Sequence, residues 1–324
     1  MHNCIQFNQD ATCFGCAGEN GFVVYNCDPI VVRFAHLKED NSDAIKYISL
    51  LNKSNIIAFV KSEQLNTVCI WNDHKNSICA EILFQDDIIT GIKLSTDYVL
   101  ISSIKETCLY SFKDNMGLIK KIDTVPNING VIDLCNNASG TVLVVYLSNN
   151  IGEIVLNDLN SEPRIIKAHT NNISNLCLNK EGTILATVSE RGTLIRIWDV
   201  KTLELLKEFR RGIDTTNITS LCFNKIGTQL LVCSEKGTMH VFYLDKQNRK
   251  STLSYFSSML PEYFDSEWSS VSVQVEPLSI CHFSYTDQDI IYVIEKNASI
   301  FKKYRLNVEE NTCLLISDME FYKK

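Results

Sequence analysis

The chain of 324 residues contains an internal repeat with a period of 45 residues. The segment LCLNKEGT, which begins at Leu176, recurs as LCFNKIGT from Leu221, and SERGT from Ser189 recurs as SEKGT from Ser234. A period of about 40–45 residues with several short β-rich runs is typical of propeller blades, which bury their hydrophobic faces only by stacking on neighbours. The repeat therefore predicts a β-propeller.

A third, weaker copy of the repeat extends this pattern towards the N-terminus. It begins at Leu134, and Gly140 in it corresponds to Gly182 of the next copy. The pair Asn149-Asn150 stands where the later copies carry residues such as Glu190-Arg191. We therefore expect one more blade of the same kind before the two clear copies.

The rest of the sequence agrees with an all-β fold. The motif IWND around Trp71 resembles IWD around Trp198, close to three repeats later. Several runs are rich in β-branched and aromatic residues between turn residues, among them Thr141–Tyr146, Ile184–Val188 and Met239–Tyr243. At about 42 residues per blade, seven blades fit the chain. We expect an all-β, seven-bladed β-propeller of the WD-repeat type, with residues 1–324 forming a single domain.

Composition favours a cytoplasmic location. The N-terminal MHNCIQ has neither a basic nor an apolar signal region, and no apolar run approaches the ~20 residues of a membrane span. Thirteen cysteines, mostly inside strand-like runs, are typical of buried thiols in a reducing compartment. Cys13 and Cys16 form a lone C-x-x-C without a second pair, so we expect no metal, and we expect no cofactor.

The charge distribution separates the middle of the chain from the rest. The net charge of −7 argues against a nucleic-acid partner. Residues 161–250 nevertheless contain 14 Lys and Arg against 9 Asp and Glu. This locally basic sector on an acidic body is suited to an anionic surface.

Two adjacent arginines, Arg210 and Arg211, lie in this basic sector within the sequence FRRG. Successive side chains of an extended segment point to opposite faces, so the two guanidinium groups look into different surroundings. Arginine binds phosphate through two parallel hydrogen bonds and stays charged. The pair therefore indicates two neighbouring anion sites, although a chance pair on a solvated turn is the alternative.

In combination, several motifs make the chain similar to the PROPPINs, the seven-bladed propellers that bind polyphosphoinositides and act in autophagy. The likeness covers nearly the whole chain, and the compact length of the chain resembles that of the shorter members of the family. The motifs are FRRG at 209–212, AH at 168–169, ATVSERGTLIRIWD at 186–199, SEKGTMHVF at 234–242, FNQD at 7–10, GFVVYNCDP at 21–29 and LPEYFDSEWS at 260–269.

The resemblance implies two headgroup pockets for phosphatidylinositol 3-phosphate and phosphatidylinositol 3,5-bisphosphate. The first, between blades 4 and 5, would use His169, Arg191, Thr193 and Arg210. The second, between blades 5 and 6, would use Arg211, Ser234, Lys236, Thr238 and His240. Cations with hydroxyl and backbone donors are the groups that a phosphate requires. The alternative for each histidine is a hydrogen-bonded packing residue.

The segment 245–260 is a candidate membrane-contact loop. Its first half is basic, and its second half has apolar residues spaced to share one face of a short helix, namely Leu253, Phe256, Met259 and Leu260. In the family the corresponding loop of the sixth blade inserts into the bilayer. The alternative is a strand that packs back onto the blade.

The resemblance also implies partners. It places a lipid-transfer partner on blades 1–3, with Asn8, Gln9 and Asp10 near the N-terminal rim. We expect a monomer that autophagy proteins bind and that is recruited peripherally to endosomal, vacuolar or autophagosomal membranes. The sequence lacks G-x-S-x-G, a phosphate loop ending in G-K-[ST], and H-E-x-x-H, so we do not expect an enzyme. A protein-protein scaffold without lipid binding is the alternative function.

Overall fold

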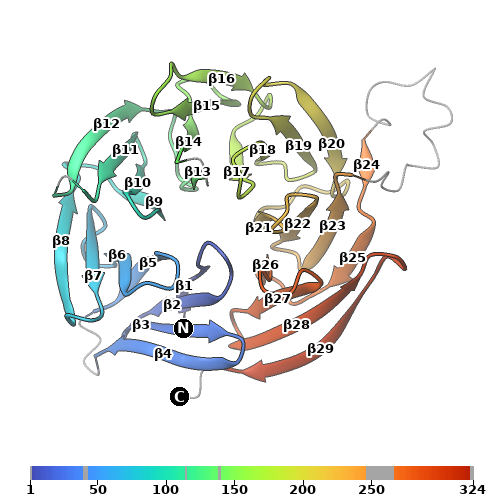
Figure 1. Ribbon diagram of the computed structural model, residues 1–324, viewed down its shortest axis with the longest axis horizontal. Coiled ribbons are helices and arrows are strands. Elements are labelled where there is room, and N and C mark those ends of the chain that lie inside the picture. Colours follow the sequence, from blue (N-terminus) through green and yellow to red (C-terminus); the bar gives the residue numbers. More distant parts are fainter. Residues whose placement is uncertain (1, 39–42, 114, 138–139, 246–265, 322–324) are drawn as a thin grey trace.

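The computed structural model describes residues 2–38, 43–113, 115–137, 140–245 and 266–321. In these ranges every secondary-structure element is a β-strand, and the strands form seven sheets in a ring around a central axis (Figure 1). The expected all-β, seven-bladed propeller is confirmed. Within the same ranges, the chain has no helix of the length and apolarity that crossing a membrane requires.

Each blade contains four strands, A to D, in chain order from the axis outwards. Blades 1 and 2 are formed by β1 His2–Phe7, β2 Cys13–Gly18, β3 Gly21–Cys27 and β4 Ile30–Leu37, and by β5 Ile45–Leu50, β6 Ile56–Lys61, β7 Thr67–Asn72 and β8 Ser77–Leu83. Blades 3 and 4 are formed by β9 Ile89–Leu94, β10 Tyr98–Ser103, β11 Glu106–Ser111 and β12 Gly117–Asp123, and by β13 Ile132–Asn136, β14 Val142–Leu147, β15 Glu153–Asp158 and β16 Arg164–Lys167.

The remaining three blades follow the same order. Blade 5 is formed by β17 Ile173–Leu178, β18 Ile184–Ser189, β19 Leu194–Asp199 and β20 Leu205–Arg210, with β24 Glu267–Trp268 added outside. Blade 6 is formed by β21 Ile218–Phe223, β22 Gln229–Ser234, β23 Thr238–Tyr243 and β25 Val271–Gln274. Blade 7 is formed by β26 Ile280–Phe283, β27 Ile290–Glu295, β28 Ile300–Asn307 and β29 Thr312–Glu320.

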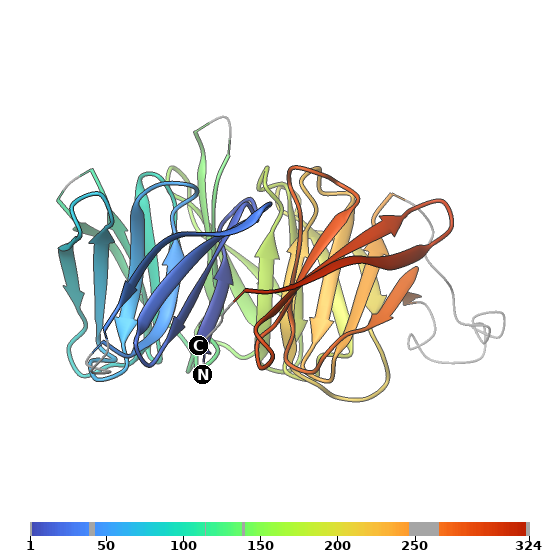
Figure 2. The same cartoon turned by 90° about the horizontal axis from the view of Figure 1, so that it is seen from below.

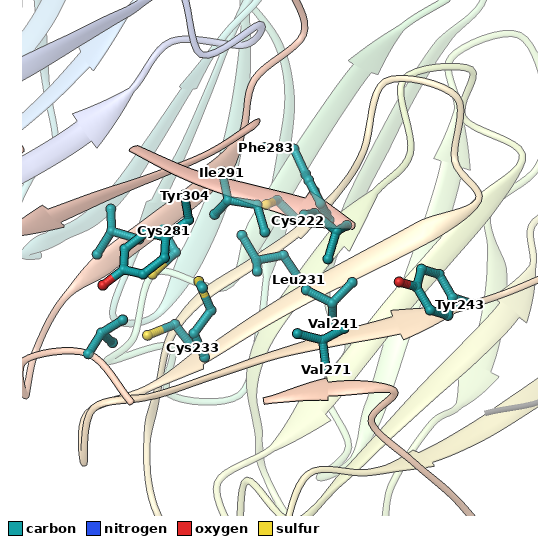
Figure 3. Close-up of a cluster of buried hydrophobic side chains, with 14 residues drawn as sticks. Cys222, Leu231, Cys233, Val241, Tyr243, Val271, Cys281, Phe283, Ile291 and Tyr304 are labelled. Carbon is teal, nitrogen blue, oxygen red and sulfur yellow. The ribbon is translucent and has the colours of Figure 1, made fainter. Parts of the chain in front are cut away.

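The hydrophobic core lies between neighbouring blades. Strand β14, VLVVYL, is buried at all six positions because other blades cover both of its faces. Between blades 6 and 7, Leu231, Val241, Phe283 and Ile291 belong to one buried cluster (Figure 3). Such face-to-face burial of β-branched and aromatic side chains is the main stabilising contribution to a propeller.

Blade 6 receives its outermost strand by an indirect route. After β23 the chain reaches the outer edge of blade 5, where β24 pairs in parallel with β20. It then returns to blade 6, where β25 pairs with β23. Ser266, directly before β24, thereby lies beside the end of β20, so the junction of blades 5 and 6 includes a residue from farther along the chain.

The strands run between the two ends of the disc (Figure 2). Because neighbouring strands are antiparallel, each turn between strands B and C lies at the same end as the loop from strand D to the next blade. We call this end the front face; it includes the B–C turns at 189–193 and 234–238 and the D–A loop at 211–217.

The repeat alignment holds with one correction. Trp71 and Trp198 both occupy the third strand of their blades, three blades apart. In blade 4, however, Gly152 is the equivalent of Gly192, because each has a positive φ and a D–A carbonyl where a Cβ would lie. Ile151 therefore occupies the place of Arg191, one residue later than the sequence alignment placed it.

Candidate functional site

A B–C turn and a D–A loop are joined at the front of blade 5. Gly192 N donates to Ser189 O at 2.9 Å, which closes the turn. Gly192 has φ +63°, and Thr216 O lies 1.9 Å from the place where a Cβ would be. Only glycine allows this approach. The turn that carries Arg191 is therefore fixed directly against the loop that follows the arginine pair.

Blade 6 repeats this construction. Gly237 N donates to Ser234 O at 3.0 Å, and Val275 O lies 2.4 Å from the Cβ position of Gly237, whose φ is +82°. Ser234 Oγ and Thr238 Oγ1 are 2.7 Å apart, so these two predicted site residues are in contact. The two S-x-[KR]-G-T turns thus have the same backbone construction on adjacent blades.

Arg210 ends β20, and Arg211 begins the next D–A loop. Their exposed fractions are only 4% and 7%. Phe209 stacks on Phe242 of blade 6, with ring centroids 4.8 Å apart. Alternation along the strand then directs Arg211 to the blade 6 side and Arg210 to the blade 4 side.

The contacts of the two arginines differ accordingly. Arg210 Nε donates to Ser266 Oγ at 2.9 Å, in the segment that precedes β24. Arg211 Nε donates to Gly192 O at 3.0 Å, and a terminal nitrogen of Arg211 donates to Asp214 O. Arg211 forms no ion pair with any described residue. Burial lowers the pKa of Arg211, and the negative charge of Asp214 opposes this effect only in part.

Two cations stand at the tips of the turns. Arg191 and Lys236 are exposed, and their side chains form no ion pair or hydrogen bond with the described part of the chain. Thr193 and Thr238, two residues further on, are half-buried. Arg211 is bonded to the turn of Arg191 through Thr193 O and Gly192 O. Both exposed cations, Arg191 and Lys236, are available to an anion from solvent.

His169 belongs to a hydrogen-bonded chain inside blade 5. Its Nε2 lies 3.0 Å from Thr187 Oγ1, which also accepts a hydrogen bond from Trp198 Nε1 at 3.0 Å. Burial, with a smaller effect of the positive charge on Arg196, lowers the pKa of His169 to about 4. His169 is therefore neutral at pH 7 and holds part of the blade framework, and its Nδ1 is the nitrogen left for a ligand.

His240 lies in strand β23, 8% exposed. Its Nδ1 is 2.9 Å from Ser269 Oγ, which lies between β24 and β25. Burial and then the charge of Arg211 lower the pKa of His240 to about 4. Without a bound anion, neither histidine has the second proton with which both ring nitrogens would donate.

Several polar residues at these junctions were missed by the sequence analysis. Arg196 binds Ala168 O at 2.7 Å and Glu208 Oε2 at 2.9 Å beside His169. Ser266 and Ser269 come from the segment that crosses between blades 5 and 6. The position of Arg196, three residues after Thr193, could have indicated that it belongs to the site. The placement of the two serines depends on the pairing of β24, which the repeat does not predict.

The predicted partner residues Asn8, Gln9 and Asp10 lie at the axial end of blade 1. Asn8 is 2% exposed, and its Oδ1 accepts from Cys13 N. Gln9 Nε2 donates to Leu50 O and Leu94 O, both at 2.9 Å, so it joins blades 1, 2 and 3. All three line an axial cavity of about 660 Å³. These contacts give Asn8 and Gln9 a structural role, and partner binding by the three residues stays a prediction.

The predicted insertion residues Leu253, Phe256, Met259 and Leu260 lie outside the described residues, as does all of the candidate loop 245–260 except Asp245. The prediction of bilayer insertion therefore stays a prediction. What the structure describes at the two ends of this segment is β23 before it and β24 after it.

The ring of seven blades and the paired arginines at adjacent junctions define a WD-type propeller with a two-part basic site. A family model described as PROPPIN matches residues 1–300. The chain belongs to the PROPPIN family.

Curated relatives agree with this assignment. The SVP1-like protein 2 of Pichia angusta is 32% identical over 337 residues, which cover 96% of this chain and 92% of that protein. Autophagy-related protein 18e of Arabidopsis thaliana is 29% identical over 270 residues, which cover 80% of this chain and 71% of that protein. Family membership supports a phosphoinositide-binding propeller of autophagy that associates peripherally with membranes.

Solved structures share the fold. The crystal structure of Kluyveromyces marxianus Hsv2 has a TM-score of 0.82 at 22% identity, and the match covers 99% of both chains. A complex of KlAtg21 with the coiled coil of AgAtg16 has a TM-score of 0.80 at 21% identity, again with 99% of both chains covered. At these identities the likeness shows the propeller architecture.

Proposed function

We propose that this protein binds phosphatidylinositol 3-phosphate and phosphatidylinositol 3,5-bisphosphate on membranes through the two junctions beside Phe209–Gly212, and that it recruits autophagy proteins there. The first pocket uses His169, Arg191, Thr193 and Arg210, and the second uses Arg211, Ser234, Lys236, Thr238 and His240. The protein acts by binding and not as an enzyme.

The observation that carries this proposal is the buried charge of Arg211. Its guanidinium contacts only neutral carbonyl oxygens, those of Gly192 and Asp214, among the described residues. The negative charge of the exposed Asp214 opposes the effect of burial on the pKa of Arg211 only in part. A nearly buried cation that forms no ion pair is costly, because neutral carbonyl groups compensate only part of its lost hydration. A phosphate group at this junction would add negative charge and accept hydrogen bonds in the geometry that a guanidinium offers.

The second pocket has complementary polar groups close to Arg211. The hydroxyl groups of Ser234 and Thr238 are in mutual contact, and Lys236 is exposed on the turn between them. The charge of Arg211 reaches His240, since it contributes to the lowered pKa of that imidazole. A bound phosphate would reverse this effect and favour protonation of His240, so that both ring nitrogens donate.

Partner recruitment rests on the relatives. One similar structure is a complex of Atg21 with a coiled coil of Atg16, so a coiled-coil autophagy protein is one candidate partner for this chain. We also propose a lipid-transfer partner on blades 1–3 near Asn8, Gln9 and Asp10, a monomeric state, and recruitment to endosomal, vacuolar or autophagosomal membranes.

Flotation with defined vesicles tests the lipid proposal. The purified protein is mixed with phosphatidylcholine vesicles that contain the 3-phosphate, the 3,5-bisphosphate or the 4-phosphate of phosphatidylinositol. We expect flotation with the first two and weaker flotation with the third. Calorimetry with the soluble headgroup inositol 1,3-bisphosphate should show weaker binding, because it lacks the avidity of two sites on one surface. Failure to float with either 3-phosphorylated lipid would favour a protein-protein scaffold without lipid binding.

A further inference from the structure

Ile213 is the most exposed apolar side chain of the basic sector, with 70% of its surface accessible. It lies on the D–A loop between blades 5 and 6, two residues after Arg211. Isolated exposed apolar residues are common on proteins, so exposure alone says little. The way in which this loop is held makes Ile213 different.

Four contacts fix the base of the loop on both sides of Ile213. Arg211 N donates to Thr193 O at 2.9 Å, and Arg211 Nε donates to Gly192 O. On the far side, Thr216 N donates to Arg191 O at 3.3 Å. The Arg211 side chain also donates to Asp214 O across the loop. The backbone around Ile213 is therefore already ordered, so little conformational entropy is lost when its side chain enters another phase.

The same contacts place Ile213 beside two cations, Arg191 and Arg211, and the exposed Asp214 next to it is a single opposing charge. The residue that accepts from Thr216 is Arg191, whose exposed side chain has no ionic partner among the described residues. Lys236 stands on the equivalent turn of blade 6. Apolar side chains flanked by cations are the pattern by which peripheral proteins enter the interface of an anionic bilayer.

We propose that Ile213 enters the interface of a phosphoinositide-containing bilayer when the two junctions hold headgroups. This inference rests on the proposed function. It adds an apolar membrane contact on the front face, within the FRRG loop itself and independent of the candidate loop 245–260. It also assigns Arg211 a second task, which is to order the loop that presents Ile213.

Ile128 provides a matched control. It lies on the D–A loop between blades 3 and 4 with 72% of its surface exposed. The neighbouring front turn carries Lys105, whose Nζ donates to Asp86 O and whose N donates to Asp87 Oδ2. This loop therefore has equal apolar exposure, but the charge of Lys105 interacts with the carboxylate of Asp87, so an anionic bilayer would attract this loop less than that of Ile213.

The test compares Ile213→Ser with Ile128→Ser on phosphatidylcholine vesicles that contain phosphatidylinositol 3-phosphate. We expect Ile213→Ser to lower vesicle affinity about tenfold, because the bilayer no longer buries an aliphatic side chain. Binding of soluble inositol 1,3-bisphosphate should not change, and Ile128→Ser should change neither. Unaltered vesicle binding by Ile213→Ser, or an equal loss of headgroup binding, would overturn the inference. If the wild type binds neither vesicles nor headgroup, the proposed function itself is wrong.

A second measurement detects insertion directly. In Ile213→Trp, brominated phosphatidylcholine should quench the new tryptophan beyond the level that the three native tryptophans give in the wild type. Ile128→Trp should show only the wild-type level. Equal quenching in both variants, or none beyond wild type in Ile213→Trp, would place Ile213 outside the bilayer while leaving headgroup recognition intact.

Discussion

The junction of blades 4 and 5 and the junction of blades 5 and 6 derive from the same repeat but use their histidines differently. At the first, His169 is bonded to Thr187, which also accepts from Trp198, so the imidazole is part of the blade framework. At the second, His240 contacts Ser269 of the crossing segment. His169, on the loop before blade 5, thus bonds to strand β18 of that blade, whereas His240, in strand β23 of blade 6, contacts the connection between β24 and β25.

The two junctions should therefore respond differently to mutation. Substitutions around His169 act on the fold of blade 5 as well as on a ligand. Around His240, the neighbouring serine belongs to a two-residue connection between β24 and β25. We therefore expect binding and stability effects to be coupled at the first junction and largely separate at the second.

Removal of both arginines should weaken vesicle binding more than any other change. Arg210→Ala and Arg211→Ala should each leave weak one-site binding to vesicles, and the double variant should lose all of it, because avidity from two linked sites amounts to about 10²–10⁴ in affinity. Flotation measures this. Arg164→Ala, which removes a half-buried arginine of blade 4, is the control. If a folded double variant still floats with the 3-phosphorylated lipids, the site assignment is wrong.

Loss of a hydroxyl tests the framework role of the first junction. Thr187→Val leaves His169 and Trp198 without their shared oxygen and should lower the free energy of unfolding by about 1–3 kcal/mol. Ser269→Ala, at a half-buried position, should cost about 1 kcal/mol or less. Urea denaturation compares them. Equal losses would show that both histidines are framework residues.

The two histidines should make the free energy of unfolding depend on pH in the acid range. Their pKa values of about 4 lie below that of an unfolded histidine, near 6.5, so the unfolded chain binds more protons between these values. Their contribution is complete above pH 6.5 and is lost as the pH falls towards 4, by at most about 1.4 kcal/mol per pH unit for each histidine.

Urea titrations at several pH values measure this slope. A variant with His169→Gln and His240→Asn should have a flatter profile, with a residual slope from His282, whose pKa burial also lowers. Vesicle binding should have the opposite sign, because phosphate favours the imidazolium and affinity rises with acid. A wild-type affinity that falls in acid more than that of the variant would contradict phosphate contact by these histidines.

The smallest expected effect is that of the exposed cations. Arg191→Ala and Lys236→Ala should each weaken vesicle binding about fivefold at low salt, because one basic residue near an anionic surface contributes about 1 kcal/mol. The loss should shrink as salt is raised, since exposed charges are screened over about 10 Å at 0.1 M. Flotation over a salt series checks both variants. A salt-independent loss would indicate that these turn residues support the pockets structurally.

The repeat predicted much of the fold because its residues form the same local contacts in each copy. Asn172 binds the side chain of Glu190, and Asn217 binds that of Glu235 in the same way, one period later. Such pairs fix the turn geometry within a blade, so similar sequence gives similar structure. The positive φ of Gly192 follows from the same logic, as does the opposite facing of the two arginines.

The rest of the site depends on contacts that no periodicity encodes. Ser266 reaches Arg210 across 56 residues, because β24 joins the outer edge of blade 5 before the chain completes blade 6. The role of His169 depends on its contact with Thr187. Thr187 is a buried position of strand β18 like its apolar neighbours, so the sequence does not mark it as a partner of the histidine. The lowered pKa of each histidine reflects burial, which sequence alone does not give.

The ring closes between blades 7 and 1 without a shared strand. In the described ranges, blade 1 takes its strands from residues 2–37 and blade 7 from residues 280–320. Aromatic rings fill the seam instead: Phe14 stacks on Phe301 with centroids 5.5 Å apart, and Phe7 lies 6.4 Å from Tyr292. Lys296 Nζ also donates to Asn3 O at 3.0 Å.

Side-chain packing closes this seam, in contrast to a seam that is closed by backbone pairing of a shared strand. The dispersion attraction between the aromatic rings has a short range, so all of these contacts are lost once the rings separate by a small distance. We therefore expect the circle to part first at this seam under pulling or in denaturant. Amide hydrogens of β1 should then exchange with solvent earlier than those of β14, deep in blade 4.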